Sequence, residues 1–150
     1  LQSRLDVDYS EMDALDLFCG TGNITYEFAS RGMRSVTSVE IDFKCYEFIQ
    51  KSLVKFDLTQ CRIIRNDVFL FLKICKIKFD LIFADPPYEM PNISKIHSLV
   101  VERDLLKPGG LLIIEHGGKT KLNHLMHFIE ARNYGNVHFS IFKIDEPPAK

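Results

Sequence analysis

An acid, two prolines and a tyrosine follow a short apolar run, and no other stretch of the sequence is as well suited to chemistry. The run covers residues 79–84, and Asp85, Pro86, Pro87 and Tyr88 come directly after it. The Asp85 carboxylate and the Pro86 carbonyl can each accept one hydrogen of a planar amine, which directs the nitrogen lone pair at an electrophile. The Tyr88 ring offers a face on which a base can stack. We therefore predict that Asp85, Pro86 and Tyr88 are catalytic; the alternative is a structural turn.

A glycine-containing turn follows an earlier apolar run. It reads Asp-Leu-Phe-Cys-Gly-Thr-Gly at 16–22, and Gly20 and Gly22 allow the backbone to turn tightly and to approach a ligand closely. A dinucleotide fingerprint would have a third glycine where this sequence has Thr25, so NAD and FAD are disfavoured. Asp16 adds a carboxylate that suits a ligand with an ammonium group. On its own, such a turn is often only structural.

Two further acids come at the ends of the next two apolar runs. Glu40 can accept hydrogen bonds from both hydroxyls of a ribose, and Asp67 can accept one from an exocyclic amine such as that of adenine. Each also has a simpler interpretation, because Glu40 could be a solvated strand end and Asp67 a helix cap. Together with Asp16, the acids describe a nucleoside that carries a cation. This favours S-adenosylmethionine over a phosphorylated cofactor.

The order of apolar runs predicts how these residues are brought together. Short strand-like runs alternate with helical patterns, which is typical of a parallel sheet covered by helices, and such sheets bind ligands beyond the carboxyl ends of their strands. We expect strands at 14–18, 35–41, 62–65, 79–84 and 111–115, with helices at 23–31, 43–56, 68–74 and 94–106.

The remaining elements are predicted from spacing and turn signals. Residues 107–110, Lys-Pro-Gly-Gly, are expected to separate the last of these helices from the strand at 111–115. The tail is expected to form a short helix or a loop that leads into a hairpin with strands at 128–132 and 137–144. The helix at 43–56 is expected to place five apolar side chains on one face, which are Cys45, Phe48, Ile49, Leu53 and Phe56.

Composition limits the class of protein. The chain has 150 residues, of which 46% are apolar and 26% charged, enough for one domain with a core. No apolar run approaches the roughly 20 residues of a membrane span, no leader peptide is recognisable, and the cysteines show no C-x-x-C spacing. The net charge of −1 argues against a broad cationic face. We expect a single cytoplasmic domain over 1–150, monomeric, with no metal site.

The motifs together resemble the class I S-adenosylmethionine-dependent amino methyltransferases. The closer resemblance is to the bacterial RsmD-type enzymes, which methylate the N2 amine of a guanine in the 16S ribosomal RNA of the small subunit. This resemblance implies an α/β, Rossmann-like fold, with a mostly parallel seven-stranded sheet, helices on both faces and an antiparallel C-terminal hairpin. The motifs that carry it are D-L-F-C-G-T-G at 16–22, V-E-I-D at 39–42, N-D at 66–67, D-P-P-Y at 85–88 and the ending at 134–142.

The resemblance also implies a role for each matched residue. Asp85 and Pro86 would hold the guanine amine, and Tyr88 would stack on the base. The partner would be 16S ribosomal RNA, either free or in an assembling subunit. These enzymes usually have an N-terminal extension with a basic hairpin that engages RNA, and we expect such a segment to be missing here. The residues implied to hold S-adenosylmethionine are Asp16, Phe18, Gly20, Gly22, Glu40, Ile41, Asp67, Val68 and Asp85.

Three other functions remain open from the sequence. The same tetrapeptide could serve adenine-N6 methylation of DNA or RNA, although no added target-recognition domain is recognisable. Glutamine-N5 methylation of a protein ranks lower, because those enzymes typically have Asn in place of Asp85. A scaffold that binds S-adenosylmethionine without catalysis is the alternative of another class, and the presence of Asp85 and Tyr88 argues against it.

Overall fold

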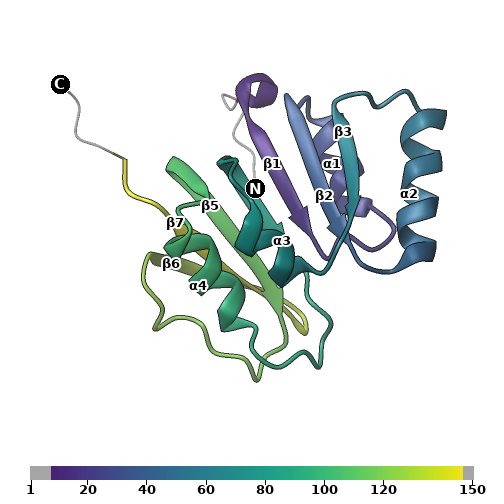
Figure 1. Cartoon of the computed structure of the whole chain (residues 1–150). Coiled ribbons are helices and arrows are strands. Elements are labelled where there is room, and N and C mark those ends of the chain that lie inside the picture. Colours follow the sequence, from purple (N-terminus) through teal and green to yellow (C-terminus); the bar gives the residue numbers. More distant parts are fainter. Residues whose placement is uncertain (1–7, 147–150) are drawn as a thin grey trace.

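In the computed structural model, which describes residues 8–146, strands and helices alternate along the chain and build one twisted sheet (Figure 1). Expectations about residues 1–7 and 147–150 lie outside the described residues. In chain order the elements are η1 (Tyr9–Glu11), β1 (Asp13–Leu17), α1 (Asn23–Ser30), β2 (Ser35–Glu40), α2 (Phe43–Lys55), β3 (Cys61–Arg65), α3 (Val68–Ile74), β4 (Phe79–Ala84), α4 (Ser94–Glu102), β5 (Leu106–His116), β6 (Phe128–Tyr134) and β7 (Val137–Lys143).

The sheet has seven strands in the order β3-β2-β1-β4-β5-β7-β6. The first five strands of the chain pair in parallel, and β7 is antiparallel to both β5 and β6. This confirms the expected mostly parallel sheet with its C-terminal hairpin. The strand order reverses between β1 and β4, which is where open sheets of this kind bind their ligands.

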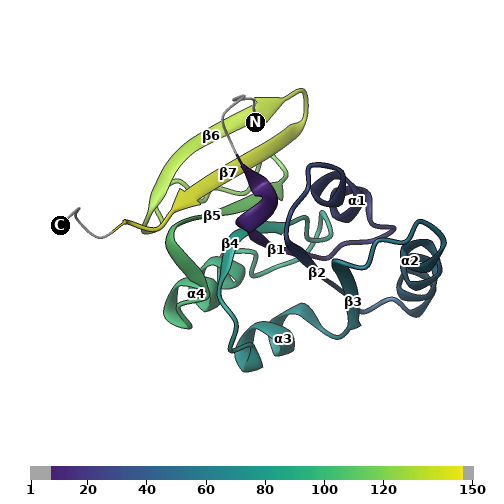
Figure 2. The same cartoon turned by 90° about the horizontal axis from the view of Figure 1, so that it is seen from above.

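Helices cover both faces of the sheet, as expected. In Figure 2, α1 and α2 lie on one side and α3 and α4 on the other. An apolar core lies on each face of the sheet, and alternate residues of β1 point to opposite faces. Leu15 and Leu17 pack with α3 and α4, and Ala14 packs with α1 and α2. No helix within residues 8–146 has the length and apolar character that a membrane crossing requires.

The expected apolar face of α2 is only partly correct. Ile49 and Leu53 are buried against the sheet, but Phe48 and Phe56 are 53% and 60% exposed as residues. The helix covers β2 and β3 at the edge of the sheet, so only a narrow stripe of its surface meets the core. Periodicity indicated the correct side of the helix and overestimated the width of the buried stripe.

Two boundaries near residue 105 also differ from the expectation. Helix α4 begins at Ser94 as expected, but it ends at Glu102, because Asp104 adopts a left-handed φ of 57° that stops the helix. Strand β5 begins at Leu106, so the Lys-Pro-Gly-Gly segment lies inside the strand as an irregularity. Phe79 pairs with Leu106, and the register then shifts before Leu81 pairs with Leu111.

The sequence left open whether a short helix or a loop precedes the C-terminal hairpin, and the structure has a loop. Residues 117–127 form turns and loop, and no helix occurs there. The chain then enters the expected hairpin, in which β6 continues to Tyr134 and Gly135 supplies the turn with a φ of 62°. The hairpin extends the sheet beyond β5, which brings its turn to the same edge as the carboxyl end of β5, since His116 pairs with His138.

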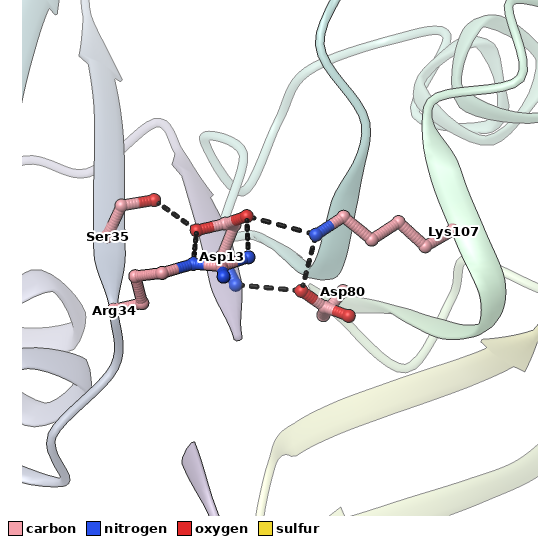
Figure 3. Close-up of polar contacts among 5 residues, drawn as sticks. All are labelled: Asp13, Arg34, Ser35, Asp80 and Lys107. Carbon is pink, nitrogen blue, oxygen red and sulfur yellow. Dashed lines mark hydrogen bonds and ion pairs between the residues drawn. The ribbon is translucent and has the colours of Figure 1, made fainter. Parts of the chain in front are cut away.

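A charged cluster ties four strands together at the opposite edge of the sheet (Figure 3). Asp13 accepts two hydrogen bonds from Arg34, at 2.8 and 3.1 Å, and one from Ser35 at 2.7 Å. The Lys107 Nζ lies 3.0 Å from Asp13 Oδ2 and 3.1 Å from Asp80 Oδ2. The Arg34 guanidinium holds the pKa of Asp13 well below its usual range. The cluster is therefore a structural tie at the amino ends of the strands.

Candidate functional site

Register places four site positions side by side at the carboxyl edge of the sheet. Leu17 of β1 pairs with Val39 of β2 and with Ala84 of β4, which in turn pairs with Ile114 of β5. The next residue of each strand therefore lies at the same edge. Those residues are Phe18, Glu40, Asp85 and Glu115.

A cavity of about 260 Å³ opens at this edge beside β1, β2 and α3. It contains six of the residues expected to hold the cofactor: Phe18, Glu40, Ile41, Asp67, Val68 and Asp85. Three further residues line the cavity. Pro87 belongs to the tetrapeptide noted in the sequence, whereas Phe69 and Met90 were not assigned a role there.

Two acids of this cavity, Glu40 and Asp67, accept hydrogen bonds from backbone N–H groups. Glu40 Oε1 accepts from the Gly20 N–H at 2.8 Å and Oε2 accepts from the Asp42 N–H at 2.9 Å, which attaches the glycine turn to β2. Asp67 Oδ1 accepts from the Leu70 N–H at 3.0 Å and so caps α3, as the simpler interpretation expected. Each carboxylate keeps free lone pairs for a ligand, so capping and ligand binding are compatible.

Asp16 lies behind the cavity and does not line it. Its residue surface is only 1% exposed, and its Oδ2 accepts a 2.7 Å hydrogen bond from the Thr25 hydroxyl, whose oxygen lies 2.6 Å from that of Ser38. Burial raises the pKa of Asp16 to about 7, and the charges of Asp85 and Glu40 add to the increase. Thr25 thus occupies the position of the absent third glycine and holds this carboxyl in place.

Gly20 and Gly22 shape the turn between β1 and α1 and also do not line the cavity. Both have positive φ, 56° for Gly20 and 94° for Gly22. A Cβ atom at Gly22 would lie 3.1 Å from Tyr26 Cζ and 3.3 Å from Ile49 Cγ1, whereas one at Gly20 would meet nothing within 4 Å. Only Gly22 is therefore required by packing as well as by backbone conformation.

A second cavity, of about 120 Å³, lies on the other side of Asp85. It contains all three residues predicted to be catalytic, Asp85, Pro86 and Tyr88. Asp85 and Pro87 line both cavities, so they form the wall between them. The other residues around the second cavity come from α4, β5 and the C-terminal hairpin or lie beside them, and they are Ile93, Glu115, His116, Asn136 and Val137.

The tetrapeptide presents an acceptor and an open aromatic face. Asp85 is solvent-accessible, and partial burial still raises the pKa of its carboxyl above the ordinary value. Tyr88 as a residue is 76% exposed. The ring of Tyr88 lies against Gly117, since a Cβ atom added there would be 2.7 Å from Tyr88 Cε1. Gly117 was not singled out from the sequence, although it leaves room for the tyrosine ring.

Known proteins resemble this chain in sequence. The family described as "Conserved hypothetical protein 95" matches residues 3–143. The ribosomal RNA small subunit methyltransferase D of Buchnera aphidicola is 33% identical over 112 residues, which cover 75% of this chain and 56% of that protein. The chain thus spans about half the length of the curated relatives it matches.

Solved structures agree with the family match. The methylase candidate HI0767 from Haemophilus influenzae aligns with a TM-score of 0.83 at 26% identity, over 92% of this chain and 89% of that chain. A 16S rRNA N2 methyltransferase from Thermus thermophilus, solved with AdoMet and guanosine, aligns with a TM-score of 0.74 at 22% identity, over 89% of this chain and 37% of that chain. The second similarity concerns the fold alone.

The fold is that of the Rossmann-like class I methyltransferases, with both cavities at the carboxyl edge of the sheet. Within that class, the chain belongs to the family described as "Conserved hypothetical protein 95", which is the family of the RsmD-type methyltransferases.

Proposed function

We propose that this protein transfers a methyl group from S-adenosylmethionine to the N2 amine of a guanine in 16S ribosomal RNA. The observation that carries the proposal is that two cavities share Asp85 as a wall. One of them has the acids and apolar side chains that suit a nucleoside, and the other has Pro86 and Tyr88. The names of the curated relatives support ribosomal RNA of the small subunit as the substrate.

The residues of the larger cavity fit the proposed cofactor. S-adenosylmethionine, when bound, supplies an electrophilic methyl group on a sulfonium centre. Glu40 has lone pairs left to accept from the ribose hydroxyls, and Asp67 has an oxygen left to accept from the adenine amine. Ile41 and Val68 add apolar surface to the cavity. We assign to Asp16, from behind the glycine turn, the negative charge that favours the ammonium group.

The residues of the smaller cavity would orient the amine. The Asp85 carboxylate and the Pro86 carbonyl each accept one amine hydrogen, so the nitrogen lone pair faces the first cavity. Tyr88, which is open to solvent on one face, stacks on the base. The nitrogen becomes positively charged as it is methylated, and it then releases a proton to Asp85 or to water. Asp85 therefore has to be ionised before the transfer.

The proposal extends to the whole protein. We propose one methyltransferase domain over 1–150 that acts as a monomer on 16S ribosomal RNA, free or in an assembling subunit. The chain spans about half the length of its curated relatives, and the proposal concerns the part that it matches. The residues described above are those that hold the cofactor and the target base.

Substitution of Asp85 tests the proposal. The Asp85→Asn protein replaces one carboxylate oxygen with an amide donor, so we expect turnover to fall by about 100-fold or more. Binding of S-adenosylhomocysteine, measured by calorimetry, is expected to change by less than about threefold, because the other cavity residues are unchanged.

Glu89→Gln is the matched control. Glu89 is an exposed acid in the same loop and lines neither cavity, so its replacement is expected to leave both turnover and binding unchanged. If Asp85→Asn retained the turnover of the unmodified protein, the catalytic assignment would be wrong. A noncatalytic scaffold would show binding without turnover in all three proteins.

A further inference from the structure

Glu115 is a second carboxylate of the smaller cavity, beside that of Asp85. It lies at the carboxyl end of β5, one residue after Ile114, which pairs with Ala84 of β4. Asp85 is one residue after Ala84, so the two acids occupy adjacent positions on neighbouring strands. Both line the same cavity, together with Pro86 and Tyr88.

The Glu115 carboxylate has no structural partner to explain its place. Among residues 8–146 it makes no side-chain hydrogen bond and no ion pair, in contrast to Glu40 at the end of β2, which accepts two backbone N–H groups. Glu115 is half-buried. Burial raises the pKa of Glu115, and the charge of Asp85 adds to the increase. Two neighbouring carboxylates without a cation between them repel each other, and a ligand that brings hydrogen-bond donors would relieve this repulsion.

We infer that Glu115 reads the N1–H of the target guanine and so determines the specificity of this site for guanine over adenine. The inference rests on the proposed function, because it concerns the base that the smaller cavity receives. Guanine carries two adjacent donor groups on one edge, the N2 amine and the N1–H. Asp85 with the Pro86 carbonyl accepts from the amine, and Glu115, the neighbouring acceptor, takes the ring N–H.

Adenine does not match this pair of acceptors. If its N6 amine were held by Asp85 and Pro86, the neighbouring ring atom would be N1, which is an acceptor without hydrogen. That atom would face the Glu115 carboxylate, so two acceptors would be buried against each other without a proton between them. A site that hydrogen-bonds a particular substrate group discriminates strongly against a substrate that lacks it. Glu115 therefore separates the two base substrates that the tetrapeptide alone leaves open.

The test uses one reacting amine and changes only the ring atom beside it. RNA substrates are made with either guanine or 2-aminopurine at the methylated position; 2-aminopurine keeps the exocyclic amine and has an unprotonated N1. We expect the unmodified protein to prefer guanine by at least about tenfold in kcat/KM. Glu115→Gln can turn its amide either way, so we expect it to lower the rate on guanine and to reduce the preference to within about threefold.

Two controls make the result specific. Glu89→Gln is expected to keep the full preference for guanine. Glu115→Ala, with no hydrogen-bonding group, is expected to lose rate on guanine without any gain on 2-aminopurine. A merely structural role of Glu115 would lower both rates equally, and binding of S-adenosylhomocysteine reports separately on folding.

The outcomes distinguish the inference from the proposal on which it rests. If the unmodified protein methylates guanine and Glu115→Gln keeps the same ratio between the two bases, the role of Glu115 is wrong and the proposed function stands. If the unmodified protein methylates no guanine at all, the proposed function is wrong and the inference is lost with it. If the ratio of kcat/KM between guanine and 2-aminopurine falls only in the Glu115 variants, the result supports both the role of Glu115 and the proposed function.

Discussion

At the scale of single residues, Asp16 has the most unusual environment of the site. It is buried behind the glycine turn with one hydroxyl donor, Thr25, and no cation beside it among the described residues. Its carboxyl therefore has a pKa of about 7 in the protein without ligand. A ligand with an ammonium group would favour the ionised form of Asp16, and cofactor binding should therefore be linked to the release of a proton.

This linkage predicts a pH dependence of binding. Below about pH 7 the Asp16 carboxyl is mostly protonated before binding, so affinity for S-adenosylhomocysteine should fall as the pH is lowered from about 8 to 5, by up to about tenfold per unit. Calorimetry in buffers of different ionisation enthalpy should detect up to about one proton released at about pH 6.

Asp16→Asn is the control for this effect. An amide does not titrate, so we expect weaker binding with a much flatter pH profile. Asp85 and Glu40 remain in that variant, so any pH dependence of binding that is left would come from other groups such as these. An unmodified protein whose affinity stayed constant over the same range would contradict the role assigned to Asp16.

At the scale of elements, local signals predicted strands and helices well where short-range chemistry decides them. The start of α3 after Asp67 and the start of α4 at Ser94 were both identified from local signals. Asp67 caps α3 with its side chain, whereas α4 has no side-chain cap. The end of α4, which is set by the left-handed φ of Asp104, was missed, and so was the start of β5, which depends on the pairing of Leu106 with Phe79 across the sheet. Turn residues such as Lys-Pro-Gly-Gly indicate an irregularity without revealing whether a strand continues through it.

The glycine turn offers a prediction at the same scale. Gly22→Ala places a Cβ atom against Tyr26 and Ile49 and also requires a left-handed backbone, so we expect a loss of more than about 2 kcal/mol in the free energy of unfolding. Gly20→Ala has the same backbone cost without the contacts and is expected to lose about 1 kcal/mol.

Urea unfolding of the two variants measures the difference directly. Equal losses for Gly20→Ala and Gly22→Ala would show that packing under the turn does not matter, contrary to the structure. Circular dichroism should confirm that both variants retain the native secondary structure at low urea.

At the scale of the whole molecule, the site is assembled by sheet order, which the sequence does not display directly. We identified three acids from the sequence because each lies at or near the end of an apolar run: Asp16, one residue before the end of β1, Glu40 at the end of β2, and Asp85 just after β4. Glu115 was not identified, because an acid at a strand end is indistinguishable from a solvated one until the register places it beside Asp85. Most residues that line the larger cavity were predicted from the sequence. Met90 of that cavity and the hairpin residue Asn136 of the smaller one come to the site only through tertiary contacts.

The charged cluster at the far edge provides a prediction about the whole sheet. Lys107 is the cation between Asp13 and Asp80, so Lys107→Met leaves these carboxylates with less compensation and should cost ~1–2 kcal/mol in unfolding free energy. Lys78→Met, which breaks an exposed pair with Asp104, should cost less than about 0.5 kcal/mol.

The pH dependence of this cluster has a definite sign. Arg34 lowers the pKa of Asp13 in the folded protein, so the stability from Asp13 is present above the ordinary Asp pKa of about 4 and is lost as the pH falls below it. Thermal unfolding at neutral and acidic pH measures both effects. If Lys107→Met and Lys78→Met were equally stable, the cluster would not tie the strands together.

Mass spectrometry can test the proposed methylation of guanine, with nucleosides from 16S ribosomal RNA that has been incubated with the purified protein and S-adenosylmethionine. We predict that N2-methylguanosine appears with the unmodified protein and not with Asp85→Asn. The appearance of N6-methyladenosine in its place would contradict the roles of Asp85 and Glu115 as acceptors for guanine, and the absence of any methylated base would contradict the proposed function itself.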